Sequence, residues 1–191
     1  MSICQNEPMS DFVSTLKGIL LARFPSINNV IEGWPDPKWF QVENNLPIVA
    51  ILDIHEKGAP ATSRLAVHAT VVNTDGTAAI VTEQMRLHTL MQISVFASTK
   101  AVRDSLGWQI KQYLITNYHI ALIDYTLATP APTGEYAMMY YRSDHKDMRG
   151  SANFYQRDLT FEVQTRVLDS TSAVQVKGTP TATIIASTTG T

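Results

Sequence analysis

The stretch QMRLHTLMQISVFASTKAVRDSLGWQIKQYLIT, residues 84–116, predicts a strand that runs directly into a helix. Up to Ala97, large apolar residues alternate with polar ones, which is the period of a strand with one face on a core. From Ser98 onward the apolar residues recur at helical spacing, and Ser98 or Thr99 is the natural N-cap. Because the helix and the strand each carry an apolar face, we expect the helix to fold back over the sheet.

A second helix and a buried strand are predicted before this unit. The helix begins at Ser10 or Asp11 and ends before Pro25, which cannot continue it. Residues 46–54 form a β-branched, nearly continuous apolar run, which is typical of a strand covered on both faces. A break is expected at residues 55–60.

The remaining body of the domain is predicted from weaker patterns. Residues 25–45 are expected to be a connector, and residues 120–127 form a short apolar stretch with the composition of a strand. Residues 158–167 alternate strictly between apolar and polar side chains. The segments 92–96 and 159–163 are therefore expected to be neighbours in one antiparallel sheet.

A long β-hairpin is predicted over residues 55–90. Its strands are residues 64–73 and 78–85, and Thr74-Asp75-Gly76 supplies the turn. The body of the fold has its core without this hairpin, so the tip is expected to protrude. Its apolar side chains then lack a core within their own domain, which indicates an interface between copies of the chain. The residues expected in this oligomer interface are Leu65, Val67, Val71 and Val72.

Residues 128–156 predict a long loop, because proline, glycine and polar residues dominate at both of its ends. A loop of this length in a compact domain is usually functional or disordered. We expect this loop, and an arm from about Ser170, to become ordered only on a partner. The alternative is that the Met-Met-Tyr-Tyr stretch is another buried strand. The residues expected to bind partners are Met138, Met139, Tyr140, Tyr141, Arg142 and Arg149.

These elements predict an α+β fold. A mainly antiparallel sheet carries two helices on one face, and the long hairpin protrudes from it. The expected organisation is a flexible leader at residues 1–9, a single domain at 10–168 and an extended C-terminal arm at 169–191.

The composition disfavours several classes of protein. The formal net charge is −2, which gives no electrostatic footprint for nucleic acid or an anionic membrane. Charged residues make up only 17% of the chain, which suits a protein that packs against copies of itself. Cys4 is the single cysteine, so no intramolecular disulfide is possible. No apolar run is long enough to span a bilayer and no signal peptide is recognisable, so we expect a cytoplasmic location or a particle assembled there.

The sequence carries no pattern that predicts catalysis, a metal site or a cofactor. The segment Asp53-Ile-His55-Glu56 places one carboxylate and one imidazole on the same side of a strand end, but no third ligand follows at a recognisable spacing. His68 and His88 are expected to face each other across the hairpin as surface residues. Neither a nucleophile elbow nor a phosphate-binding glycine loop occurs, so an enzyme is not expected.

A basic and aromatic cluster lies between residues 140 and 157. Such a cluster could track a polyanion. Asp144, Asp147 and Asp158 interrupt it, so a mixed-charge contact surface is expected in place of a nucleic-acid groove.

The order of predicted elements resembles that of the tail-terminator proteins of long-tailed bacteriophages, also called tail-completion or neck proteins. The similarity covers roughly residues 10–168, and it rests on the strand from Pro47, on the strand Gln92–Ala97 and on the amphipathic helix that follows at once from Lys100. The resemblance implies a small α/β domain that closes into a hexameric ring on the finished tail tube. This ring stops tube polymerisation and offers its other face to the head connector.

The resemblance also implies the partners and the location. The chain would bind itself, the tail tube protein, the head–tail connector or a neck protein, and the sheath protein where the tail is contractile. No membrane is involved, and DNA is only cargo that passes through the ring lumen. The protein would be assembled in the host cytoplasm and reside in the virion tail or neck.

Two other readings stay open. The chain could be another neck, tube or baseplate protein of a phage, which would polymerise or trimerise instead of closing a ring. It could also be a small hydrolase with an unrecognised site, which replacement of His55, His119 and His145 would test.

Overall fold

The computed structural model describes residues 8–41, 45–60, 67–72, 77–147 and 154–175. Residues 39, 41, 56–60, 67–72, 77–80 and 169–175 are described by their backbone alone. A seven-stranded sheet runs in the order β1-β2-β4-β7-β6-β5, with β3 also paired to β4. Only the β1–β2 pair is parallel among the described strands, so the sheet is mixed but mainly antiparallel. The elements are α1 Pro8–Arg23, β1 Asn29–Glu32, the 3-10 helix η1 Pro37–Gln41, β2 Ile48–Pro60, β3 Val67–Val72, β4 Thr77–Ala97, α2 Lys100–Thr116, β5 His119–Asp124, β6 Ala131–Lys146 and β7 Tyr155–Gln175.

The strand-to-helix unit forms as the sequence predicts. Strand β4 ends at Ala97 and α2 begins three residues later, with Thr99 as N-cap. The Thr99 hydroxyl accepts a hydrogen bond from the Val102 amide at 3.2 Å, which satisfies one donor of the first turn. The predicted pairing of segments 92–96 and 159–163 is also confirmed, since Ile93 lies opposite Leu159 in the β4–β7 register.

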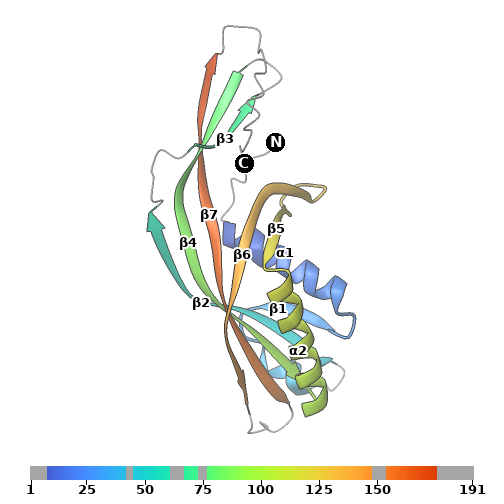
Figure 1. The fold of residues 1–191 in the computed structure, drawn as a ribbon. Coiled ribbons are helices and arrows are strands. Elements are labelled where there is room, and N and C mark those ends of the chain that lie inside the picture. Colours follow the sequence, from blue (N-terminus) through green and yellow to red (C-terminus); the bar gives the residue numbers. More distant parts are fainter. Residues whose placement is uncertain (1–7, 42–44, 61–66, 73–76, 148–153, 176–191) are drawn as a thin grey trace, which may run out of the picture.

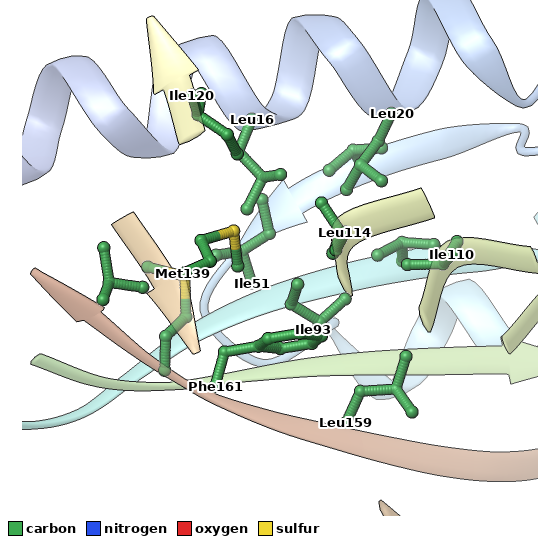
Figure 2. Packing of buried hydrophobic residues seen from close by; sticks show 14 of the residues in the cluster. Leu16, Leu20, Ile51, Ile93, Ile110, Leu114, Ile120, Met139, Leu159 and Phe161 are labelled. Carbon is green, nitrogen blue, oxygen red and sulfur yellow. The ribbon is translucent and has the colours of Figure 1, made fainter. Parts of the chain in front are cut away.

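Both helices cover the same face of the sheet (Figure 1). Their apolar stripes meet the alternating side chains of the central strands, and the largest buried cluster lies between these two layers (Figure 2). This arrangement confirms the α+β fold with two helices on one face. Fully buried side chains in this layer include Leu16 and Leu20 of α1, Ile110 and Leu114 of α2, Ile93 of β4 and Phe161 of β7.

A smaller core covers one end of the opposite face. Phe96 packs there with Ile48, Ala50 and Leu46, and Phe40 and Phe154 stack on each other at 4.1 Å between ring centroids. Trp34 approaches Phe96 at 6.3 Å and remains 65% exposed. These aromatic contacts hold the connector against the sheet.

The protruding part of the fold is a three-stranded ribbon, where a two-stranded hairpin was predicted. Strands β4 and β7 are 21 residues each, and they run past the helices with β3 beside the far end of β4 (Figure 1). Residues 77–85 of β4 pair with β7 residues 167–175, which the sequence assigned largely to a C-terminal arm. The arm prediction is therefore wrong up to Gln175. Throughout, "the ribbon" denotes residues 67–72, 77–85 and 165–175.

Other boundaries also differ from the predictions. The predicted break at 55–60 is absent, because these residues extend β2 through backbone pairing with β4. The predicted 128–156 loop is wrong, since residues 131–146 form β6 and residues 155–156 belong to β7. Helix α1 begins at Pro8, so the predicted leader is too long by two residues. The connector contains the unpredicted elements β1 and η1.

Candidate assembly surface

Beyond the small aromatic core at one end, the sheet face opposite α1 and α2 has no helix over it among the described residues, and its residues follow from the strand register. Across β5, β6, β7 and β4, a row of paired positions runs through His119, Met138, Gln164 and His88. We call this surface the open face. Its described members are His55, His88, Leu90, Gln92, His119, Tyr136, Met138, Tyr140, Arg142, Thr160, Glu162, Gln164 and Arg166, all of them half-buried or exposed.

Glu162 is the electrostatic centre of the open face. Its carboxylate accepts hydrogen bonds from His88 Nδ1 at 3.0 Å, from Arg142 Nη2 and from Gln164 Nε2 at 3.1 Å. These donors, His88 first, lower the pKa of Glu162 to about 2. The carboxylate is therefore ionised at neutral pH and already has partners within its own chain.

Aromatic side chains gather at the β5 edge of the open face. The His119 ring stacks on Tyr136 at 5.1 Å and meets Tyr118 edge-on at 4.4 Å. The Arg166 guanidinium lies 5.2 Å from the Tyr136 ring centroid and donates a hydrogen bond to its hydroxyl at 3.2 Å. Exposed tyrosine and arginine side chains are enriched in protein–protein interfaces, so this edge has the composition of a contact surface.

The structure divides the predicted partner-binding residues between two faces. Met138 and Tyr140 lie on the open face, and Tyr140 is 38% exposed. Met139 is only 2% exposed in the main core, and Tyr141 packs edge-on against Phe161. Because successive residues of a strand point to opposite faces, the four could not act together as one contact. The buried-strand alternative holds for Met139, and Tyr141 is half-buried on the same, helix-covered face. Partner binding by Met138 and Tyr140 stays a prediction.

The two predicted arginine contacts have different outcomes. Arg142 is 54% exposed along its side chain but is paired with Glu162 of its own chain. Arg149 lies outside the described residues. The sequence predicts that Arg142 binds an acidic group of another protein. In the structure its exposed side chain is already paired with a carboxylate of its own chain.

Three of the four predicted oligomer-interface residues belong to the ribbon. Val67, Val71 and Val72 lie in β3, where the backbone pairs with β4 residues 78–82. Leu65 lies outside the described residues. His68 does not pair with His88 as predicted, because the register sets Lys57 and Gln164 beside His88. The role of the three valines as an interface stays a prediction.

A buried ionic network, which the sequence did not predict, joins α2 to β6 and β7. Asp144 accepts hydrogen bonds from Arg157 Nε and Nη2 at 2.9 and 2.6 Å, and from Lys111 Nζ at 3.2 Å. These donors, Arg157 first, lower the pKa of Asp144 to about 2. The Arg103 side chain is 2% exposed and donates a hydrogen bond to the Asp147 carbonyl at 2.8 Å. Arg157 of the predicted basic and aromatic cluster is thus internal structure, whereas Tyr140, Arg142 and Lys146 are exposed.

The possible metal ligands named from the sequence lie at the surface as far as they are described. Asp53 and His55 are both exposed on an edge of β2. Among the residues that the structure describes, no group of three His, Cys, Asp or Glu side chains is placed to hold a metal ion. In the same part of the chain, no helix is long and apolar enough to cross a membrane.

Sequence comparisons give no relatives: no family model matches the chain, and no curated protein matches it. A structural comparison finds similarity to a chain in the solved structure "Virion of native gene transfer agent (GTA) particle". The alignment covers 81% of this chain and 90% of that chain, with 12% sequence identity and a TM-score of 0.37.

Proposed function

We propose that the protein is a structural virion component that closes into a ring on the end of a phage tail tube. The ring ends tube polymerisation and joins the tail to the head connector. The observation that carries this proposal is the ribbon, which extends beyond the helices (Figure 1) and whose outer strands, β3 and β7, have no further partner strand there among the described residues. The resemblance of the element order to tail-terminator proteins supplies the particular role.

Two strand edges beside and along the ribbon come from different strands, β2 and β7. Strand β1 pairs with β2 only as far as Ile51, so no described strand covers the outer edge of β2 from Leu52 to Pro60. On the other side, β6 pairs with β7 only as far as Gln164, and no described strand pairs with the outer edge beyond it. A strand edge presents a row of backbone donors and acceptors that can pair with another chain.

Two different edges favour a head-to-tail interface. If the β7 edge of one copy pairs with the β2 or β3 edge of the next, each copy uses both surfaces once. Such heterologous contacts generate a closed ring when the rotation between copies closes. A hexamer is the ring size that the family resemblance implies.

The open face supplies the contact with other virion proteins in this proposal. Tyr136, Met138 and Tyr140 present adaptable apolar surface there, beside Arg142 and Arg166. The tail tube protein, the connector and the sheath protein of a contractile tail are the partners. DNA passes through the ring without being recognised.

A tube-growth assay tests the capping function. The purified full chain is added to polymerising tail tube protein, and tube lengths are measured by electron microscopy. The proposal predicts shorter tubes that carry the added protein at one end only. Tubes of unchanged length, or binding along the tube wall, would contradict it.

A further inference from the structure

The outward face of α2 carries a neutral seam that has no cover within the described chain. Exposed residues at spacings of four and three form it, and the helix lies at the periphery of the fold (Figure 1). This spacing is typical of a helix that packs against another helix. The seam consists of Ala101, Ser105, Trp108, Gln112 and Ile115.

The seam differs from an ordinary solvent-facing helix surface. Solvent-facing stripes of amphipathic helices are normally charged, whereas the only charged residue among the exposed positions of α2 is Lys100. Trp108 is 51% exposed and Ile115 is 41% exposed. Tryptophan is the residue most typical of interface hot spots.

We infer that this seam binds the same seam of a second copy, with the two α2 helices antiparallel about a two-fold axis. Trp108 is the middle residue of Lys100–Thr116, so the axis sets it against its own equivalent. The same axis places the small Ala101 opposite the large Ile115 of the other copy at both ends. Ser105 of one copy then lies close to Gln112 of the other, so polar residues contact polar residues.

Charge selects the antiparallel arrangement over the parallel one. In the antiparallel pair, Lys100 of each copy lies at the C-terminal end of the other α2. The last carbonyls of a helix carry partial negative charge, so a cation is stabilised there. A parallel pair would set Lys100 against Lys100 and Ala101 against Ala101, which combines repulsion with a gap.

A groove beside the seam enlarges the contact. It is lined by Arg23, the last residue of α1, by Phe24 directly after it, and by Trp108, Gln112 and Tyr113 of α2. A helix of this length presents a seam about 25 Å long, so the interface is at the small end of the specific range. Weak pairing of single copies becomes strong when several copies in one ring engage at once.

Two single substitutions test the register without disturbing the helix. Ala101→Glu adds an acid to the first turn of α2, and Ile115→Lys adds a base to the last turn; both suit the helix dipole at exposed positions. Each alone places a charge against an apolar residue of the other copy. When the two variants are mixed, the introduced glutamate of one copy lies against the introduced lysine of the other, and the unchanged Ala101 lies against the unchanged Ile115 at the second contact.

Native mass spectrometry of the full chain across a concentration series gives the readout. We expect an even number of subunits for the wild type, half that number for each single variant at the same concentration, and the full number again for the mixture. A subunit number that neither variant changes would overturn the inference. Dissociation of both variants without recovery in the mixture would overturn it as well.

Discussion

Arg157 binds Asp144 through two hydrogen bonds, from Nε at 2.9 Å and from Nη2 at 2.6 Å, directly beneath Gly107 of α2. The same guanidinium donates to the Asp104 carbonyl at 2.9 Å, so β6, β7 and α2 meet at one buried cation. The Arg157 side chain is 4% exposed. This junction fixes the helix on the sheet, and it holds the strands whose outer face is proposed to contact partners.

Removing the acid from this junction should destabilise the fold strongly. Asp144→Ala leaves the Arg157 charge buried without its carboxylate, which typically lowers the free energy of unfolding by about 3–5 kcal/mol. Urea denaturation measures the change. The double variant Asp144→Ala with Arg157→Met should recover part of the loss, because no buried charge remains. A double variant less stable than Asp144→Ala would contradict this account of the junction.

The same pair predicts a pH dependence in acid. The pKa of Asp144 is lowered from 3.8 to about 2 by Arg157 and Lys111, so its stabilisation is fully present above the unfolded-state pKa. That stabilisation, roughly 2 kcal/mol, is lost as the pH falls from about 4 toward 2. Urea denaturation of the wild type and Asp144→Asn at several pH values separates this loss from that due to Glu162. The stability difference between the two proteins should shrink over this window; a constant difference would refute the assignment.

Gly107 should not tolerate a side chain. A Cβ there would lie 2.5 Å from Arg157 Cδ, and the guanidinium cannot retreat because Asp144 holds it. Gly107→Ala should therefore cost about 1–3 kcal/mol of stability, although alanine favours a helix by about 1 kcal/mol over glycine. Gln109→Ala, at an exposed position of the same helix outside the seam, is the matched control and should change the stability by less than about 0.5 kcal/mol. A stabilised Gly107→Ala protein would show that the junction is looser than described.

Neighbouring residues of β6 should separate stability from partner binding. Met139→Ala empties part of the main core and should lower the free energy of unfolding by about 2–5 kcal/mol. Tyr140→Ala, on the open face, should leave stability nearly unchanged and weaken binding to assembled tail tubes at least about tenfold, as the loss of an interface hot spot does. Thermal unfolding and co-sedimentation with tubes measure the two effects. Equal tube binding by Tyr140→Ala and wild type would remove the open face from the proposed contact.

Local pattern was sufficient for the strand-to-helix unit but not for β6 or the end of β2. The period of two before Ser98 and the helical spacing after it survive in the structure because both segments face one core. In β6 the register shifts between Tyr141 and Ser143, so Asp144 returns to the helix side and the alternation in the sequence is interrupted. Residues 55–60 form a strand because they pair with β4. Their amino-acid composition does not predict this non-local contact.

The candidate site was predictable only in part for the same reason. Tyr140 and Met138 stood out as adaptable apolar residues, but only the register shows that Met139 and Tyr141 face the other way. Charged residues between 142 and 157 had the pattern of a solvated loop. The burial of Asp144 and Arg157 depends in part on α2, whose Lys111 lies 33 residues before Asp144 along the chain.

The central claim, that the ribbon closes copies into a ring, is tested most directly by native mass spectrometry of two shortened chains. Deletion of residues 60–80 removes β3 and the first four residues of β4, and truncation after Leu168 removes the far end of β7; both leave every residue of the main core in place. Thermal unfolding checks that the body of each variant folds. The account predicts a closed ring for the full chain, and loss of that ring in both variants while the body stays folded. A folded full chain that never forms a ring, or rings that survive both deletions, would contradict it.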